Sequence, residues 1–454
     1  MRVSAESGRG APAIMWILAL IVGAAIIASA FLIFGPRPTD FAGGKRVALT
    51  DYKASDPTGV PAELKSASLV ERGEYLTRAA DCRACHTARD GQPFAGGRAF
   101  VLPFGTLYST NITPDAETGI GNYTDAEFLG AVHKGVGRGN TKLYPAMPYA
   151  SYAYMTDADA LAIKAYLFSL KPLRAAAPQN TLAFPFNQRA LISMWSVLFN
   201  PDTRYEPNID RSPEWNRGAY LVEAMEHCGE CHTPRNIFFA LNNRRKFAGT
   251  VQAGWRAYNI TPDRSGGVGT WSDADLSQYL ATGHADGRGT AAGPMGEAVD
   301  ESFKYLKPTD IAAMVTYLRS VADLPAADLP QPKLDAAADS GADNPVVKVD
   351  SRGKEVYEGA CAGCHGWTGI TADLPLATLL GTRDINDPTA NNVVQIIIGG
   401  AQRHVAAAAD NMPAFGRTYS DAEIASVANF VTARYGATPS RMTAAQVARL
   451  RAEN

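Results

Sequence analysis

Six cysteines and three histidines form three copies of one short motif, Cys-x-x-Cys-His. The copies are Cys82-Arg83-Ala84-Cys85-His86, Cys228-Gly229-Glu230-Cys231-His232 and Cys361-Ala362-Gly363-Cys364-His365. Two thiols at this spacing can attach a haem covalently, and the adjacent imidazole can bind its iron. The copies use all six cysteines of the 454-residue chain, which leaves no thiol for a disulfide. The pattern predicts three covalently bound haem c groups.

Zinc or redox sites are the alternative reading of the same cysteine pairs. Zinc ribbons place two Cys-x-x-Cys pairs about 15 to 20 residues apart. Here the three histidines are separated by 146 and 133 residues. This spacing favours haem over a shared zinc ion.

A haem iron held by one histidine needs a sixth ligand, and methionine suits electron transfer. Three methionines are each next to a proline: Met147, Met295 and Met412. They follow the motif histidines by 61, 63 and 47 residues. Proline disfavours helix, so we expect each sulfur to be presented by a loop. Bis-histidine ligation is the alternative, because each predicted domain holds a spare histidine: His133, His284 and His404.

Two helices are expected around each motif. One precedes it, at residues 70–80, 216–226 and 352–359, and each of these stretches holds an Arg-Gly pair whose small glycine would let a second helix approach closely. The second has apolar residues at i, i+3, i+4 and i+7, beginning at Ile163, Ile311 and Ile424. Its start is marked by Thr156, Thr309 and Ser420 as hydroxyl caps.

The first two thirds of the chain contain an internal repeat. Asn111-Ile112-Thr113-Pro114-Asp115 recurs as Asn259-Ile260-Thr261-Pro262-Asp263, a shift of 148 residues, and the histidines shift by 146. This indicates tandem duplication. We therefore predict a mainly α chain with three haem domains in tandem behind one transmembrane helix. Its parts are an anchor (1–36), a stalk (37–66), domain 1 (67–172), an apolar connecting segment (173–211), domain 2 (212–323), a linker (324–349), domain 3 (350–437) and a tail helix (438–454).

Residues 11–34 contain no charge and are long enough, as a helix, to cross the hydrocarbon layer of a bilayer. The alternative is a signal peptide cleaved at Ala28-Ser29-Ala30, but the apolar run continues beyond this site. A retained membrane anchor is therefore predicted. A second apolar run, residues 191–199, is too short to span and must be covered, either by domains 1 and 2 or by a membrane or quinone-side contact. The balance of 43 Lys+Arg against 45 Asp+Glu, without a basic block, excludes nucleic acid as a partner.

The chain resembles the triheme cytochrome c subunits of bacterial membrane-bound dehydrogenases. The likeness rests on the three Cys-x-x-Cys-His motifs, the twin Asn-Ile-Thr-Pro-Asp segments, Tyr144-Pro145-Ala146-Met147-Pro148-Tyr149 and Trp215-Asn216-Arg217-Gly218-Ala219-Tyr220-Leu221. It implies cytochrome c-type domains, thioether bonds at the six cysteines, proximal ligation by His86, His232 and His365, and distal ligation by Met147, Met295 and Met412.

The resemblance also implies a function and a location. Such a subunit is no enzyme itself: it takes electrons from a catalytic dehydrogenase subunit that oxidises an aldehyde, alcohol or sugar acid, and passes them to ubiquinone or the respiratory chain. The retained anchor favours a molybdenum aldehyde dehydrogenase type of partner over quinoprotein and flavoprotein types. Haem attachment implies a single-pass protein of the bacterial inner membrane with its haem domains in the periplasm. A multihaem peroxidase, or a cytochrome c subunit of a terminal oxidase, is the alternative.

Overall fold

The computed structural model describes residues 11–34, 60–325, 329–333, 351–371, 374–405 and 408–453. The chain divides into two compact units, Met1–Phe41 and Ala42–Asn454, which are described separately. Most of the predicted stalk (37–66) and most of the predicted linker (324–349) lie outside the described residues. Because residues 42–454 form one unit, the division into three domains stays a prediction, and we refer below to a first (60–172), second (212–325) and third (351–453) region.

In the first unit the structure describes residues 11–34, which form helix α1 (Ala11–Phe34), of 24 residues without a charged side chain. This confirms that the predicted apolar segment is helical. Its side chains are described for residues 15–27. Within the described part of the chain, no helix combines the length and the hydropathy needed to cross a membrane.

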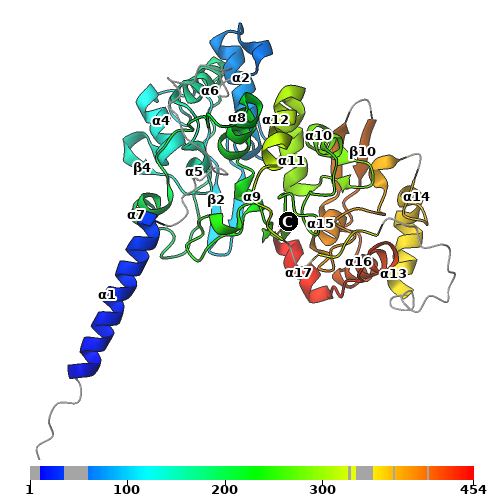
Figure 1. Ribbon diagram of the computed structural model, residues 1–454. Helices are drawn as coiled ribbons and strands as arrows, with labels where there is room; N and C mark the ends of the chain where they lie inside the picture. The colour runs from blue at the N-terminus through cyan, green and yellow to red at the C-terminus, as the bar shows by residue number, and fades with distance from the viewer. Residues whose placement is uncertain are drawn as a thin grey trace, which may run out of the picture. The chain divides into compact units, whose positions relative to one another are not determined.

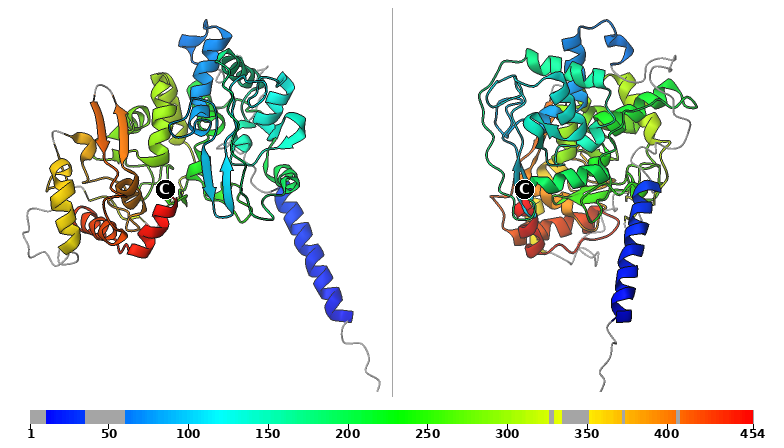
Figure 2. Two further views of the ribbon diagram at one scale, coloured as in Figure 1. Left: turned by 180° about the vertical axis from the view of Figure 1, so that it is seen from behind. Right: turned by 90° about the vertical axis from the view of Figure 1, so that its left-hand side faces the viewer.

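The second unit is mainly helical, and its described strands pair into five antiparallel sheets of two strands each (Figures 1 and 2). The elements of the first region are η2 (Ala62–Leu64), α2 (Leu69–Ala79), α3 (Cys82–Cys85), β1 (Ala99–Leu102), β2 (Gly105–Tyr108), α4 (Asp125–Lys134), β3 (Val136–Gly137), η3 (Arg138–Asn140), β4 (Thr141–Lys142), α5 (Tyr149–Tyr152) and α6 (Asp157–Ser169). The connecting segment forms α7 (Arg189–Phe199).

The second and third regions repeat much of this order. The second contains α8 (Pro213–Tyr220), η4 (Leu221–Met225), α9 (Gly229–His232), η5 (Asn243–Arg245), β5 (Thr250–Gln252), β6 (Trp255–Ala257), α10 (Asp273–Thr282), β7 (His284–Ala285), β8 (Gly289–Thr290), α11 (Gly293–Glu301), η6 (Phe303–Tyr305) and α12 (Pro308–Leu318). The third contains α13 (Ser351–Val356), η8 (Tyr357–Cys361), α14 (Ala362–His365), η9 (Pro375–Ala377), α15 (Asn391–Gly399), β9 (Ala401–Val405), β10 (Ala408–Met412), α16 (Asp421–Tyr435) and α17 (Ala444–Glu453).

Each motif follows a helix that packs against a later helix, as predicted: α2 on α6, α8 on α12 and α13 on α16. One glycine lies at each crossing. A Cβ added at Gly73 would lie 2.7 Å from the backbone carbon of Ala162, and one added at Gly218 would lie 2.5 Å from that of Ala313. The helices therefore touch backbone to backbone, which only glycine permits.

The predicted starts of the closing helices are confirmed in two cases and wrong in the third. The Thr156 hydroxyl accepts a hydrogen bond from the Asp159 amide, and Ser420 forms a reciprocal capping box with Glu423. Helix α12 instead begins at Pro308, so Thr309 lies inside its first turn and Lys307 precedes it without a side-chain cap. Proline is favoured in a first turn because it has no N–H to leave unpaired.

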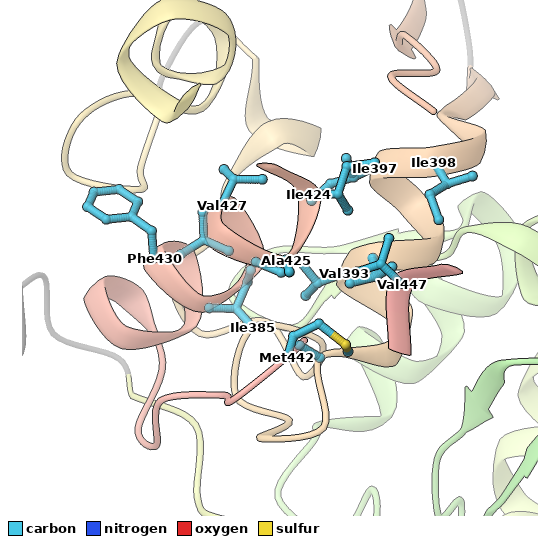
Figure 3. Packing of buried hydrophobic residues seen from close by; sticks show 14 of the residues in the cluster. Ile385, Val393, Ile397, Ile398, Ile424, Ala425, Val427, Phe430, Met442 and Val447 are labelled. Atoms are coloured by element: carbon cyan, nitrogen blue, oxygen red, sulfur yellow. The ribbon is translucent and has the colours of Figure 1, made fainter. Parts of the chain in front are cut away.

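The third region has its own apolar core, in which residues of α15, α16 and α17 meet (Figure 3). Ile424 and Val394 are fully buried there, as is Val447 of α17. The predicted tail helix is thus confirmed as a helix, and it packs into this core rather than standing apart.

Candidate haem-binding sites

The three motifs lie on short helices, α3, α9 and α14, each of which comes after the first helix of a packed pair and before the second. In the first two regions the residue before the motif, Asp81 or His227, has a positive φ of 48° or 38°, which turns the chain out of the preceding helix. His227 is therefore a counterpart of Asp81. It is half-buried, and its ring lies 5.4 Å from that of Tyr152. In the second and third regions a π-helical turn, η4 or η8, precedes the motif.

Each motif histidine makes the same hydrogen bond. The Nδ1 atoms of His86, His232 and His365 lie 2.7, 2.6 and 2.6 Å from the backbone carbonyl oxygens of Thr110, Tyr258 and Ala377. A carbonyl can only accept, so Nδ1 carries the proton and Nε2 is left with its lone pair. Burial lowers the pKa of all three imidazoles, which keeps them neutral. A neutral imidazole oriented through Nδ1 is the form that binds a metal through Nε2.

The duplicated Asn-Ile-Thr-Pro-Asp segments hold two of these carbonyls in place. Thr110 and Tyr258 directly precede Asn111 and Asn259. The Asn111 side chain accepts a hydrogen bond from the Thr113 amide and donates to the Leu173 carbonyl, at 2.8 and 2.7 Å. Asn259 makes the equivalent bonds to Thr261 and Leu324 at the same distances. The sequence showed the repeated segment, but its role in orienting the histidines was not predicted.

All six cysteines are free thiols in this structure. Burial raises the pKa of Cys82 and Cys85 to about 12 and that of Cys231 and Cys361 to about 11. The thiols are thus protonated at neutral pH. Unpaired thiols beside a histidine with a free Nε2 fit covalently attached haem, in which the histidine ligates the iron and the iron exchanges single electrons.

The predicted methionine ligands are half-buried in all three regions, but they do not all lie in loops. Met147 lies in a turn before α5, as predicted. Met295 lies in the first turn of α11, and Met412 is the last residue of β10. The loop prediction was wrong for Met295 because Pro294 occupies a helix start, where its missing N–H costs nothing. Three other methionines are buried in the core: Met155, Met225 and Met314.

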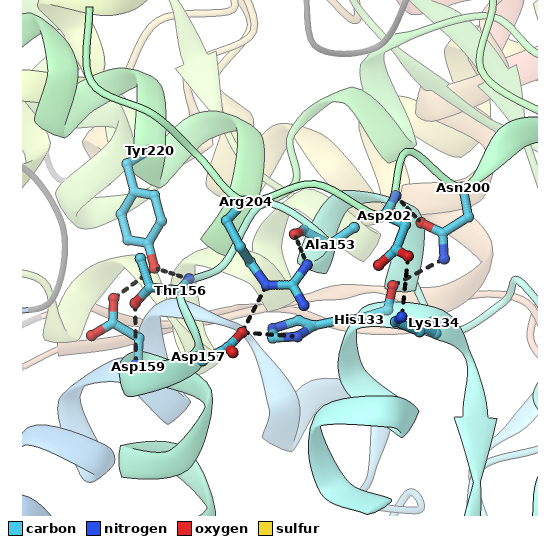
Figure 4. Close-up of polar contacts among 10 residues, drawn as sticks. All are labelled: His133, Lys134, Ala153, Thr156, Asp157, Asp159, Asn200, Asp202, Arg204 and Tyr220. Atoms are coloured by element: carbon cyan, nitrogen blue, oxygen red, sulfur yellow. Dashed lines mark hydrogen bonds and ion pairs between the residues drawn. The ribbon is translucent and has the colours of Figure 1, made fainter. Parts of the chain in front are cut away.

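The two spare histidines whose side chains the structure describes have different surroundings. The ring nitrogens of His284 lie 2.8 Å from the Thr290 hydroxyl and 3.1 Å from an Asp286 carboxylate oxygen. His133 is fully buried, and its Nδ1 lies 3.5 Å from Asp157 (Figure 4). The contacts of His284 do not favour its binding to a haem iron, whereas neither ring nitrogen of the buried His133 has a hydrogen-bond partner within the described residues. His404 lies on β9, and its side chain is outside the described residues.

The surroundings of His133 explain why its ring is neutral. Arg204 lies beside it and donates to the same carboxylate oxygen of Asp157, at 2.8 Å (Figure 4). Burial, and then the Arg204 charge, lower the pKa of His133 to about 4, although Asp157 opposes this shift. The ring therefore carries no charge at neutral pH.

The first and second motifs lie next to each other. Arg83, within the first motif, pairs with Glu301 of α11 at 2.9 Å, and Arg98 pairs with Glu297 of the same helix at 2.8 Å. In the other direction, Ser151 of α5 donates to Glu230 of the second motif at 2.8 Å. Each motif therefore contacts the element that carries, or closely follows, the candidate methionine of the other region.

Two tyrosines join these regions with an approximate twofold relation. The Tyr75 hydroxyl of α2 donates to Asp310 of α12 at 2.6 Å, and it accepts from the Lys307 amide at 3.1 Å. The Tyr220 hydroxyl of α8 donates to Asp159 of α6 at 2.6 Å and accepts from the Thr156 amide at 3.1 Å. We call these three-group arrangements, each made of a tyrosine hydroxyl, a carboxylate and a backbone amide, the tyrosine clamps. Each region thus completes the N-terminus of the other region's closing helix.

Known proteins resemble this chain over most of its length. Residues 70–171 match the cytochrome c family, and residues 349–431 match the family described as cytochrome c oxidase, cbb3-type, subunit III. The fructose dehydrogenase cytochrome subunit of Gluconobacter japonicus is 39% identical over 422 residues, which cover 89% of this chain and 86% of the relative. The gluconate 2-dehydrogenase cytochrome c subunit of Pantoea cypripedii is 39% identical over 427 residues, 89% of this chain and 92% of the relative.

A third relative extends the range of substrates in the group. The cytochrome c subunit of the quinone-type alcohol dehydrogenase of Gluconacetobacter polyoxogenes is 34% identical over 399 residues, 85% of this chain and 84% of the relative. None of these three names a molybdenum aldehyde dehydrogenase, so that expectation has no support in them. Three oriented histidines beside free thiol pairs, together with these likenesses, lead to one conclusion. The chain belongs to the cytochrome c subunits of bacterial dehydrogenases, which carry covalently bound haem c.

Proposed function

We propose that this chain is the triheme electron-transfer subunit of a membrane-bound dehydrogenase, with one haem in each of three domains bounded as predicted above. It takes electrons from a catalytic partner subunit and delivers them to ubiquinone. The observation that carries the proposal is the threefold repetition of one arrangement: a Cys-x-x-Cys-His motif after a packed helix, with the histidine Nδ1 bonded to a carbonyl. Three such sites in one chain suit stepwise transfer of single electrons.

The ligand assignment belongs to the same proposal. Thioether bonds form at Cys82, Cys85, Cys228, Cys231, Cys361 and Cys364. The iron is held between His86 and Met147, His232 and Met295, and His365 and Met412. The support is the half-burial of these methionines and the engagement of His284 by other groups.

Membrane attachment through α1 is the remaining part. The helix has 24 uncharged residues, enough for about 36 Å of rise against a hydrocarbon layer of about 30 Å. The haem domains would then lie on the periplasmic side of the inner membrane, where a membrane-confined quinone is within reach. Amino-terminal sequencing of the mature chain tests this part, because a start at Phe31 would mean that the helix is cleaved.

Haem content and ligation can be measured on the purified full chain. A pyridine haemochrome assay with intact mass should give three haems, and a Cys361→Ser/Cys364→Ser variant should give two. Low-temperature EPR and magnetic circular dichroism should show histidine–methionine ligation at every iron. Two haems in the mature wild type, or a bis-histidine signal, would overturn the corresponding part. The co-purifying subunit in native membranes identifies the partner.

A cytochrome c subunit of a terminal oxidase is the second candidate, because residues 349–431 match an oxidase subunit family. The same purification separates the two. A dehydrogenase subunit in the complex supports our proposal, and a large oxidase subunit supports the alternative.

A further inference from the structure

The connecting segment does not bury its apolar residues as a linker packed between two domains would. On α7, only Ile192 is buried, whereas Leu191, Met194, Val197 and Leu198 are 47%, 63%, 83% and 42% exposed. Successive residues of a helix are about 100° apart, so these four side chains share one face. Trp195 and Phe199 are half-buried, and their rings pack against Tyr149 and Phe238. Helix α7 therefore presents a solvent-facing apolar stripe.

A loop of the second region extends this stripe. Ile237, Phe238 and Phe239 are 86%, 58% and 53% exposed. The Trp195 indole N–H donates to the Phe238 carbonyl at 2.8 Å, and the rings of Phe199 and Phe238 lie 5.9 Å apart. The loop is thus fixed against α7 by a hydrogen bond and by aromatic packing.

Two phenylalanines before α7 complete the surface. Phe184 is 79% and Phe186 39% exposed. The Phe186 ring stacks on Phe104 at 3.9 Å and lies 6.5 Å from the ring of Phe239. We call the whole surface the apolar platform; its members are Phe184, Phe186, Leu191, Met194, Val197, Leu198, Ile237, Phe238 and Phe239. Outside α1, these are nine of the sixteen exposed large apolar side chains in the described residues.

The segments that carry the platform hold charged residues of one sign only, and the nearest acids along the chain, Asp202 and Glu230, are paired with Lys134 and Arg235. Residues 160–201 and 231–248, which contain all nine members, include no aspartate or glutamate. Arg189 begins α7 and is exposed, and Arg244 and Arg245 follow the loop and are exposed as well. A protein interface carries a polar rim of mixed composition, whereas an apolar face edged by cations is typical of segments that lie in the boundary of an anionic bilayer.

We propose that the apolar platform is a second membrane contact, which inserts its side chains into the headgroup boundary of an anionic bilayer. The inference rests on the membrane side of the proposed function. The charge-free α1 and the 25 residues from Gly35 to Gly59 would keep the haem regions close to the bilayer, and the platform would fix which face meets it. Contacts of this kind are strengthened by anionic lipid and weakened by salt.

Lipid labelling tests the proposal on the full, haem-loaded chain. The chain is placed in vesicles of phosphatidylglycerol and phosphatidylcholine that contain a photoactivatable phospholipid, and labelled peptides are identified by mass spectrometry. We expect label in α1, in residues 184–199 and in residues 237–239. Val197→Glu/Ile237→Glu changes the two most exposed members, so the haem spectrum should stay unchanged. Platform label relative to α1 label should fall by about fivefold, because a carboxylate resists the apolar boundary.

The control is Ile370→Glu, which adds the same charge at a 49% exposed isoleucine of the third region and should not change the labelling. Label in α1 but not in the platform would overturn this inference and leave the anchor standing. Label in the platform alone would support the inference and remove the anchor, and label in neither would overturn both. Native membranes contain the assembled complex, so the same labelling is repeated on them. Loss of platform label there would mean that a partner protein covers the platform, which also overturns the inference.

Discussion

The third region offers a matched pair of glycines that tests the backbone contact between helices. Gly353 of α13 faces α16, and a Cβ there would lie 2.7 Å from the Ser426 backbone carbon and 2.9 Å from the Phe430 Cβ. Carbon atoms in contact prefer about 3.5–4.0 Å, so Gly353→Ala must push the two helices apart by about 1 Å. Gly359, six residues later in η8, has no heavy atom within 4 Å of its added Cβ. The same Gly→Ala substitution is therefore made at two positions that differ in how closely they are packed.

The expected effects have opposite signs. The clash is with backbone atoms, so its cost lies near the upper end of the overpacking range, at about 3 kcal/mol; the better helix propensity of alanine returns about 1 kcal/mol, so Gly353→Ala should lose about 2 kcal/mol. Gly359→Ala has no clash and should gain about 0.5 kcal/mol.

Native-state hydrogen exchange of α16 in the full, haem-loaded chain measures this difference within one region. A loss of about 2 kcal/mol corresponds to exchange about 25-fold faster, because about 1.4 kcal/mol is tenfold. Gly359→Ala should leave the exchange unchanged or slower. If Gly353→Ala leaves α16 as protected as in the wild type, the close approach of α13 and α16 is not real.

Three further substitutions test separate parts of the chain. His133→Phe should reduce the loss of stability in acid, because burial lowers the pKa of the folded ring to about 4 while the unfolded ring has a pKa of about 6.5, so the wild type loses stability as pH falls between these values. Urea titrations at several pH values measure this, and an unchanged dependence of the unfolding free energy on pH would contradict it. Met295→His should lower the potential of one haem only, which redox titration can follow, and equal shifts at all haems would contradict the assignment. Tyr220→Phe should cost about 1–3 kcal/mol of unfolding free energy, because it deprives the Asp159 carboxylate of a buried donor, whereas Tyr305→Phe, at a 39% exposed ring, should cost nothing measurable.

The parts of the fold that could be predicted are those that depend on the type and spacing of side chains. The haem motifs, the packed helix pairs and the caps at Thr156 and Ser420 follow from residue spacing, and the structure contains the helices and caps where they were expected. The start of α12 was predicted too late in the chain, because Pro308 and Thr309 are both typical of helix starts and the helix begins at the earlier of the two. The two-stranded sheets were missed, since strands of two to five residues are too short to show an alternating pattern.

The sequence allowed a prediction for the cysteines and histidines of the site, but none for the groups that orient the histidines. Thr110, Tyr258 and Ala377 act through backbone carbonyls, which every residue has, so their side chains give no signal. The repeated segments after Thr110 and Tyr258 were the available clue. The exposure of α7 could not be predicted from its composition either, because an apolar helix has the same kind of sequence whether protein or a membrane covers it.

The tyrosine clamps have a consequence for the order in which the chain can fold. Tyr75 lies near the beginning of the described chain, but both of its partners, Asp310 and the Lys307 amide, are made more than 230 residues later. During synthesis from the amino terminus, the first region must therefore wait with a polar group of its interior unpaired until the end of the second region has emerged. The second clamp closes sooner, because Tyr220 meets the already completed Asp159. The first two regions are thus expected to fold together as one cooperative unit. A chain truncated between them should not complete the packing next to its first haem motif.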